Sequence, residues 1–116
     1  MLWEGIGEMP YYLYQVAYTP EAWAVQIKQP ENRIEAVHPV IEGLGGRIEG
    51  GWLSFGDYDV VLIIHMPDNA SLAAFAIAVA ASGAIKTAKT TPLLTIEEGM
   101  EAMNKAAAAG YRPPGG

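Results

Sequence analysis

The stretch Arg47–Met66, which reads RIEGGWLSFGDYDVVLIIHM, decides the fold because it holds two strand-like runs around a single turn. At its centre, Gly56-Asp57 is a glycine-first pair typical of a tight hairpin turn of type II′ or I′. The runs on either side, Arg47–Phe55 and Tyr58–Met66, are rich in large apolar and β-branched residues. The sequence therefore predicts that they form neighbouring antiparallel strands.

Counting outward from a two-residue turn also predicts which side chains share a face of the hairpin. One face is expected to pair Phe55 with Tyr58, Leu53 with Val60 and Gly51 with Leu62, and the other to pair Trp52 with Val61 and Ile48 with His65. This grouping holds for a turn of two or four residues and fails for three. The residues expected to be neighbours are His65, Ile48, Ile63 and Trp52.

The rest of the chain supplies two further strands and the helices, each marked by its own start or stop signal. The expected elements are a strand over Tyr11–Tyr18, helical segments from Pro20 that Pro30 interrupts and Gly45-Gly46 ends, a helix from Asp68 to Gly83, a strand over Ile85–Leu94, and a helix that the capping box Thr95–Glu98 opens. The order βαββαβ with a C-terminal helix predicts an α+β, ferredoxin-like domain, with a four-stranded antiparallel sheet and its helices on one face.

The length of 116 residues is that of one domain. We predict a domain over residues 10–110, an N-terminal extension over residues 1–9 that shows no strand pattern, and a disordered proline- and glycine-rich tail over residues 111–116.

The second face of the predicted sheet lacks the polar alternation of a face that meets water. Val60–Ile64 is apolar at every position, and Tyr11–Tyr14 places large side chains on both faces of its strand. Something other than water must cover this second face. We therefore expect the chain to form a homodimer or a larger homo-oligomer.

The amino-acid composition limits which other partners and which cellular location we expect for the chain. Thirteen acidic against seven basic residues give a net charge of −6, the wrong sign for a nucleic-acid-binding surface. There is no cysteine, and Met1–Pro10 lacks the pattern of a signal peptide, so a cytoplasmic location is expected. The apolar run Ala70–Ile85 is too short to cross a bilayer and is expected to form a buried helix.

Residues Gly56-Asp57-Tyr58-Asp59-Val60-Val61 resemble the Gly-x-Tyr-Asp signature of the GYD family. The resemblance spans Pro10–Ala106, and the segments that agree with it are Arg33–Val37, Gly45-Gly46-Arg47, Pro67-Asp68, Ala80–Gly83 and Thr95–Glu98. The family is similar in layout to dimeric α+β barrel proteins, which include cofactor-independent monooxygenases, isomerases and haem enzymes. The resemblance therefore implies a dimeric α+β barrel and does not fix the chemistry.

The segment Gly56-Asp57-Tyr58-Asp59 offers two carboxylates, Asp57 and Asp59, beside the phenol of Tyr58. Such a group suits acid–base chemistry or a metal ion, but the same residues also suit a hairpin turn, because Asp is a common turn former and Gly56 supplies a positive φ. We favour the turn. We expect no metal site and no cofactor.

Three residues are candidates for catalysis: His65 as a proton shuttle, with Tyr14 and Trp52 around an apolar pocket. Each is also an ordinary core or interface residue. Tyr12, Trp23 and Asp59 are candidates for ligand binding, because rings on strands and helices can line a pocket for a small apolar ligand. The favoured hypothesis is a small-molecule-binding or interaction module, and the alternative is a small cofactor-independent oxygenase or isomerase.

Overall fold

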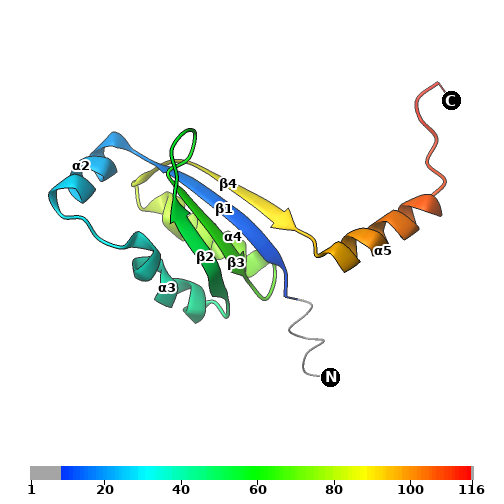
Figure 1. Ribbon diagram of the computed structural model, residues 1–116, viewed down its shortest axis with the longest axis horizontal. Coiled ribbons are helices and arrows are strands. Elements are labelled where there is room, and N and C mark those ends of the chain that lie inside the picture. Colours follow the sequence, from blue (N-terminus) through cyan, green and yellow to red (C-terminus); the bar gives the residue numbers. More distant parts are fainter. Residues whose placement is uncertain (1–8, 116) are drawn as a thin grey trace.

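The computed structural model describes residues 9–115, which form four strands and four helices (Figure 1). In chain order the elements are β1 (Tyr11–Tyr18), α2 (Pro20–Lys28), α3 (Arg33–Gly43), β2 (Arg47–Leu53), β3 (Val60–His65), α4 (Asn69–Ala81), β4 (Ile85–Leu93) and α5 (Ile96–Ala107). The strands make one antiparallel sheet in the order β2-β3-β1-β4. The predicted α+β, ferredoxin-like fold is confirmed. The expected N-terminal extension, except Met9, lies outside the described residues.

The helices begin at side chains that cap them, as the sequence signals predicted. Thr19 caps α2 by accepting a hydrogen bond from the backbone N–H of Ala22 (3.1 Å), and Asp68 caps α4 in the same way (2.8 Å to the N–H of Ser71). Thr95 and Glu98 form the reciprocal capping box of α5. Each cap satisfies an N–H group that the first helical turn leaves without a partner, so these starts follow from local chemistry.

The β2–β3 hairpin has the predicted register but a longer loop than predicted. Leu53 pairs with Val60, and the six residues 54–59 between them form the loop, which a hydrogen bond from the N–H of Ser54 to the carbonyl of Asp59 closes (2.8 Å). Because six is an even number, the paired side chains still lie on the faces of the sheet that were expected for a two-residue turn. The predicted pairing of Phe55 with Tyr58 is wrong, because Phe55 lies in this loop with its side chain fully exposed.

A β-bulge at Glu49 overturns one further pairing. Ile48 pairs with Ile64, and Arg47 takes the position opposite His65. The extra residue returns Ile48 to the core, against which it packs. The predicted pair of Ile48 and His65 is therefore wrong.

The core lies on one face of the sheet, beneath α3 and α4, and α4 is drawn behind the strands in Figure 1. Its strand residues are Tyr12, Tyr14, Val16, Tyr18, Val60, Leu62 and Ile64, and its helix residues are Ile41, Leu72 and Phe75. Only Leu72 and Phe75 of α4 are buried, so the helix expected to be buried is buried along one side only. That helix packs one stripe on the sheet and exposes the rest.

The other face of the sheet, called here the open face, has no helix over it in Figure 1. Its centre is apolar and contains Leu13, Val61 and Ile63, which neighbouring side chains half-bury. Trp52 stands at its β2 border and is 57% exposed. The predicted lack of polar alternation is thus present in the fold.

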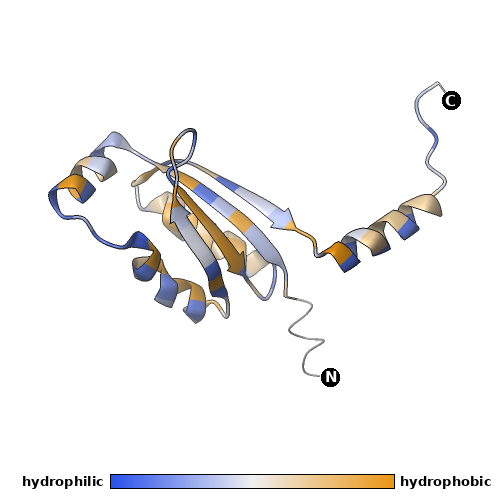
Figure 2. Ribbon diagram, viewed as in Figure 1, coloured by the Kyte–Doolittle hydropathy of each residue, from blue (hydrophilic) through white to orange (hydrophobic). Residues whose placement is uncertain are grey.

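Helix α5 projects beyond the end of β4 and away from the body of the domain (Figure 1). None of its residues is buried. The radius of gyration is 17.7 Å, whereas a compact chain of this length has about 13 Å. Figure 2 shows apolar residues distributed along this detached helix. Within residues 9–115, no helix has the length and apolar character needed to span a bilayer.

Candidate functional site

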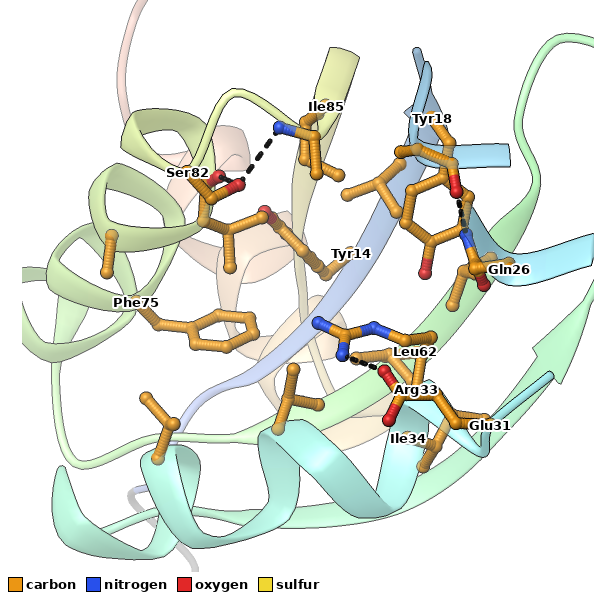
Figure 3. A pocket seen from close by; sticks show the side chains of 18 of the residues that line it. Tyr14, Tyr18, Gln26, Glu31, Arg33, Ile34, Leu62, Phe75, Ser82 and Ile85 are labelled. Atoms are coloured by element: carbon orange, nitrogen blue, oxygen red, sulfur yellow. Dashed lines mark hydrogen bonds and ion pairs between the residues drawn. The ribbon is translucent and has the colours of Figure 1, made fainter. Parts of the chain in front are cut away.

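A pocket opens on the helix-covered face of the sheet, between α3 and α4 (Figure 3). Its volume is about 460 Å³, within the range of small-molecule sites. Strands β1 and β3 form its floor, and α3 and α4 form its walls together with residues of α2. Its lining includes Tyr14 and Leu62 of the floor, Val37 and Val40 of α3, and Phe75 and Val79 of α4.

The pocket exists because the facing side of α4 carries small side chains. Beyond Phe75, this side presents Ala78, Val79 and Ser82 to the pocket. Side chains of this size leave a gap to α3 where larger ones would close it, since protein interiors are otherwise close-packed. The alanine-rich composition of this helix, from which a buried helix was expected, is the sequence feature that accompanies the pocket.

Tyr14 contributes a buried hydroxyl to the residues that form the pocket floor. Its side chain is 2% exposed, and the hydroxyl has no hydrogen-bond partner among the described residues. The ring packs against Phe75, with 5.2 Å between centroids. Burial raises the pKa of Tyr14 to about 12, so the group is a neutral hydrogen-bond donor near pH 7.

Charged and polar residues stand at the mouth of the pocket. Arg33 donates a hydrogen bond to Glu31 (2.6 Å), which raises the pKa of the arginine. Burial raises the pKa of the nearby Tyr18 phenol, with the Arg33 charge opposing this shift. Figure 3 shows the guanidinium and the carboxylate side by side at one wall. The mouth thus carries a mutually neutralised pair. Our sequence analysis did not single out either residue for this place.

The three candidates for catalysis do not come together. Tyr14 lies on the pocket floor, whereas His65 and Trp52 belong to the opposite, open face. His65 is 3% exposed and packs on Tyr11 (3.6 Å between ring centroids). Its Nε2 atom lies 3.4 Å from a Glu49 oxygen without making a hydrogen bond. The sheet therefore separates His65 from the pocket.

The candidates for ligand binding also serve other roles. Tyr12 is buried in the core and donates its hydroxyl hydrogen bond to Asn69. Trp23 stacks edge-on against Tyr18 (5.3 Å) and lines a second, neighbouring hollow of about 430 Å³ beneath α2. Neither residue lines the pocket between α3 and α4.

A family model described as the GYD domain matches residues 12–103. The chain belongs to the GYD domain family. A search of curated proteins found no match.

Solved structures with a similar fold include transcriptional regulators. An AsnC family transcriptional regulator from Agrobacterium tumefaciens superposes with a TM-score of 0.50 at 14% identity, over 78% of this chain and 53% of that one. A transcriptional regulator from Neisseria meningitidis, solved with L-Met, gives 0.49 at 14% identity, over 80% and 55%. A protein of unknown function from Nitrosomonas europaea gives 0.42 at 15% identity, over 75% and 91%. The chain spans about half the length of the two regulators.

The signature of this GYD domain fills a loop that the rest of the fold holds in place. Asp59 accepts hydrogen bonds from the backbone N–H of Tyr18 (2.9 Å) and from the indole of Trp23 (3.3 Å). Gly56 has a φ of +126°, which favours glycine. The Asp57 side chain is exposed. Within residues 9–115, no three His, Cys, Asp or Glu residues gather where they could hold a metal ion.

Proposed function

We propose that this GYD domain is a small-molecule-binding module that works as a homo-oligomer. Its ligand is a mostly apolar, uncharged molecule with an oxygen atom that accepts a hydrogen bond. The ligand occupies the pocket between α3 and α4, and the copies associate through the open face of the sheet.

The unpaired hydroxyl of Tyr14 carries the proposal. A buried polar group without a partner costs about 1–3 kcal/mol of stability, so native structures rarely retain one. Here Tyr14 lines a pocket that is open to ligands, and neighbouring atoms cover its hydroxyl. A ligand oxygen that displaces these neighbours and reaches the hydroxyl supplies the missing partner. The phenol stays protonated until about pH 12 and therefore acts as a donor.

The walls of the pocket favour an uncharged ligand. Val37 and Val40 face Phe75 and Val79 across it, so a charged group placed between them would lose its hydration without gaining an ionic partner. The charged residues at the mouth, Arg33 and Glu31, already neutralise each other. Apolar contact thus supplies affinity, and the Tyr14 hydroxyl supplies orientation.

Binding is favoured over the alternative of a cofactor-independent oxygenase or isomerase. General acid–base chemistry needs a group whose pKa lies near the working pH. The Tyr14 phenol, at about 12, is far from it, and His65 lies across the sheet from the pocket. The pocket therefore offers a place to hold a molecule more readily than a group to transform it.

The open face supports association between copies. Leu13, Val61 and Ile63 lie at its centre, and the exposed ring of Trp52 borders it. A second copy that presents the same face would remove this apolar surface from water, as symmetric dimers do. Light scattering at micromolar concentration should then report at least twice the 12.4 kDa chain mass.

Substitutions at two neighbouring residues of β3 distinguish an effect on association from an effect on folding. Ile63→Asp places a charge on the open face and should give a folded monomer, whereas Leu62→Asp places it in the core and should unfold the chain. A wild-type chain that stays monomeric at micromolar concentration contradicts the proposed association.

Ligand binding is tested with prodan, a fluorescent naphthalene that is neutral and carries a ketone oxygen. Prodan should bind with saturation. Tyr14→Phe should weaken binding about tenfold, the equivalent of one neutral hydrogen bond. Tyr12→Phe is the matched control, since Tyr12 lies two residues away on the same buried face with its hydroxyl bonded to Asn69. The control should change the dissociation constant less than twofold.

Filling the pocket gives a second test. Ala78 lines the pocket and is exposed, so Ala78→Phe adds a ring there without disturbing the core, and should abolish prodan binding while the protein remains folded. The proposal fails if prodan does not saturate, or if Tyr14→Phe and Tyr12→Phe bind it equally well.

A further inference from the structure

Helix α5 carries an apolar stripe that no part of the described chain covers. Ile96, Met100 and Met103 follow one another at helical spacing, and their exposed fractions lie between 56% and 79%. A helix of twelve residues is marginal in water by itself, and most of its stability has to come from packing of its apolar face. This helix therefore needs a docking surface.

The path of the chain directs α5 away from its own sheet. Only Leu94 and Thr95 separate β4 from the helix, and Thr95 is extended (φ −68°, ψ 164°). The helix therefore continues outward beyond the end of β4 (Figure 1). Its apolar stripe points to a surface that another molecule supplies.

We propose that α5 is an arm that docks on a second copy of this chain, with its apolar stripe against the border of that copy's open face. The stripe consists of Ile96, Met100 and Met103. In a symmetric pair each arm holds the other copy, so both stripes are covered at once. This inference rests on the proposed self-association.

The area that a stable dimer needs favours a second copy as the occupant. Taken as a flat rectangle of four strands, about 4.8 Å apart with a rise of about 3.3 Å per residue, the open face measures roughly 480 Å². Standard interfaces bury about 800 Å² of accessible surface on each partner. The sheet face is thus of modest size for a dimer interface, and the arm adds contact to it.

The position of α5 in the chain and the charges on the two surfaces agree with this docking. Leu93 ends β4 opposite Tyr11, so a copy seated on the open face at this end lies beside the start of α5. Lys89 of β4 lies on the open face opposite Gln15 and makes no ion pair within the described residues, and neither does Glu97 of α5. The arm brings acidic residues to a face that carries an unpaired lysine.

The first test measures the dimer dissociation constant of the full chain by analytical ultracentrifugation. Met100→Glu places a charge in the stripe and should weaken the dimer at least tenfold. Ala102→Glu adds the same charge on the opposite side of the helix, and should change the constant less than twofold. Equal constants for these two variants overturn the inference.

Methionine methyl NMR provides a second readout in the unmodified chain. On dilution through the dissociation constant, the signals of Met100 and Met103 should shift, because docking removes them from water. Met66 is fully buried in the core and is the internal control, which should stay unchanged. If Met100 and Met103 do not respond to dilution, α5 is free or folded on its own sheet, and the inference is wrong.

The failure of the arm and the failure of the dimer give different results. A wild-type monomer rejects both. A dimer that Ile63→Asp dissociates and Met100→Glu leaves intact rejects the arm alone, and leaves the proposed function standing.

Discussion

The carboxylate of Asp59 holds the indole of Trp23, whose Nε1 atom donates a hydrogen bond of 3.3 Å to Oδ2. The same oxygen accepts from the backbone N–H of Tyr18 (2.9 Å). One residue of the β2–β3 loop therefore joins the end of β1 to the helix that follows it. The backbone of Asp59 adds two further bonds, to Val16 (2.7 Å) and from Ser54 (2.8 Å). In this chain, the aspartate of the Gly-x-Tyr-Asp signature therefore joins the loop to β1 and α2.

Replacing Asp59 should therefore destabilise the protein, whereas replacing Asp57 should not. Asp59→Ala leaves the N–H groups of Tyr18 and Trp23 without their acceptor. Because hydrogen bonds to a charged group contribute about 1.5–3 kcal/mol, the free energy of unfolding should fall by about 2–3 kcal/mol. Asp57→Ala, on the exposed part of the loop, should change it by less than about 0.5 kcal/mol. Urea denaturation of both variants checks this, and equal stabilities would refute the structural role.

Alanine substitutions at two glycines near the end of α3 should have different effects on the free energy of unfolding. A Cβ atom on Gly46 would overlap the carbonyl oxygen of His65 and come within 2.6 Å of the Met66 sulfur. Because backbone cannot yield easily, Gly46→Ala should cost about 2–3 kcal/mol. Gly43 ends α3 with nothing within 4 Å of such an atom, so Gly43→Ala should be neutral or stabilise by up to about 1 kcal/mol. Melting temperatures that fall equally would show that the space around Gly46 is misjudged.

The elements were predictable because local signals mark them, but their irregularities were not. Caps such as Thr19 and Asp68 act through neighbouring backbone, so sequence reveals them. The length of the loop at residues 54–59 depends instead on the contacts of Asp59 with β1 and α2, which are distant in sequence. The bulge at Glu49 likewise reflects how β2 meets the core.

The candidate site was predictable only in part. Tyr14 was singled out as a pocket residue, and it lies in the pocket. The sequence pattern grouped it with His65 and Trp52, which the alternation of side chains along β3 and β2 places on the other face. The pocket itself depends on the distance between α3 and α4, which is set by tertiary packing. Small residues such as Ala78 allow a gap between the helices, but they do not determine its size.

Acidification should destabilise the protein through His65. Burial lowers the pKa of this imidazole below its ordinary 6.5 and the charge of Arg47 lowers it further, while Glu49 and the backbone carbonyl of Met9 oppose the shift. The unfolded chain then binds a proton more readily than the folded one. The free energy of unfolding should therefore fall as the pH drops below about 6.5.

The measurement for His65 is the melting temperature between about pH 7.5 and pH 5. His65→Gln should show a shallower decline than the wild type over this interval. His38→Gln is the comparison, because it removes the exposed imidazole of α3, and the difference between the two profiles is the effect of His65. Identical profiles for the two variants would rule out the imidazole as the source.

The two buried tyrosines of β1 should differ in the sign of their contribution to stability. Tyr14→Phe removes a buried hydroxyl that has no partner, so the ligand-free protein should become more stable by about 1 kcal/mol. Tyr12→Phe removes a hydroxyl that is bonded to Asn69, and should lower stability by about 1 kcal/mol. Urea unfolding without ligand measures both changes. A gain in stability at Tyr14 together with a loss of prodan affinity indicates that this hydroxyl is retained for binding, whereas a loss of stability would mean that the hydroxyl already has a partner in the free protein.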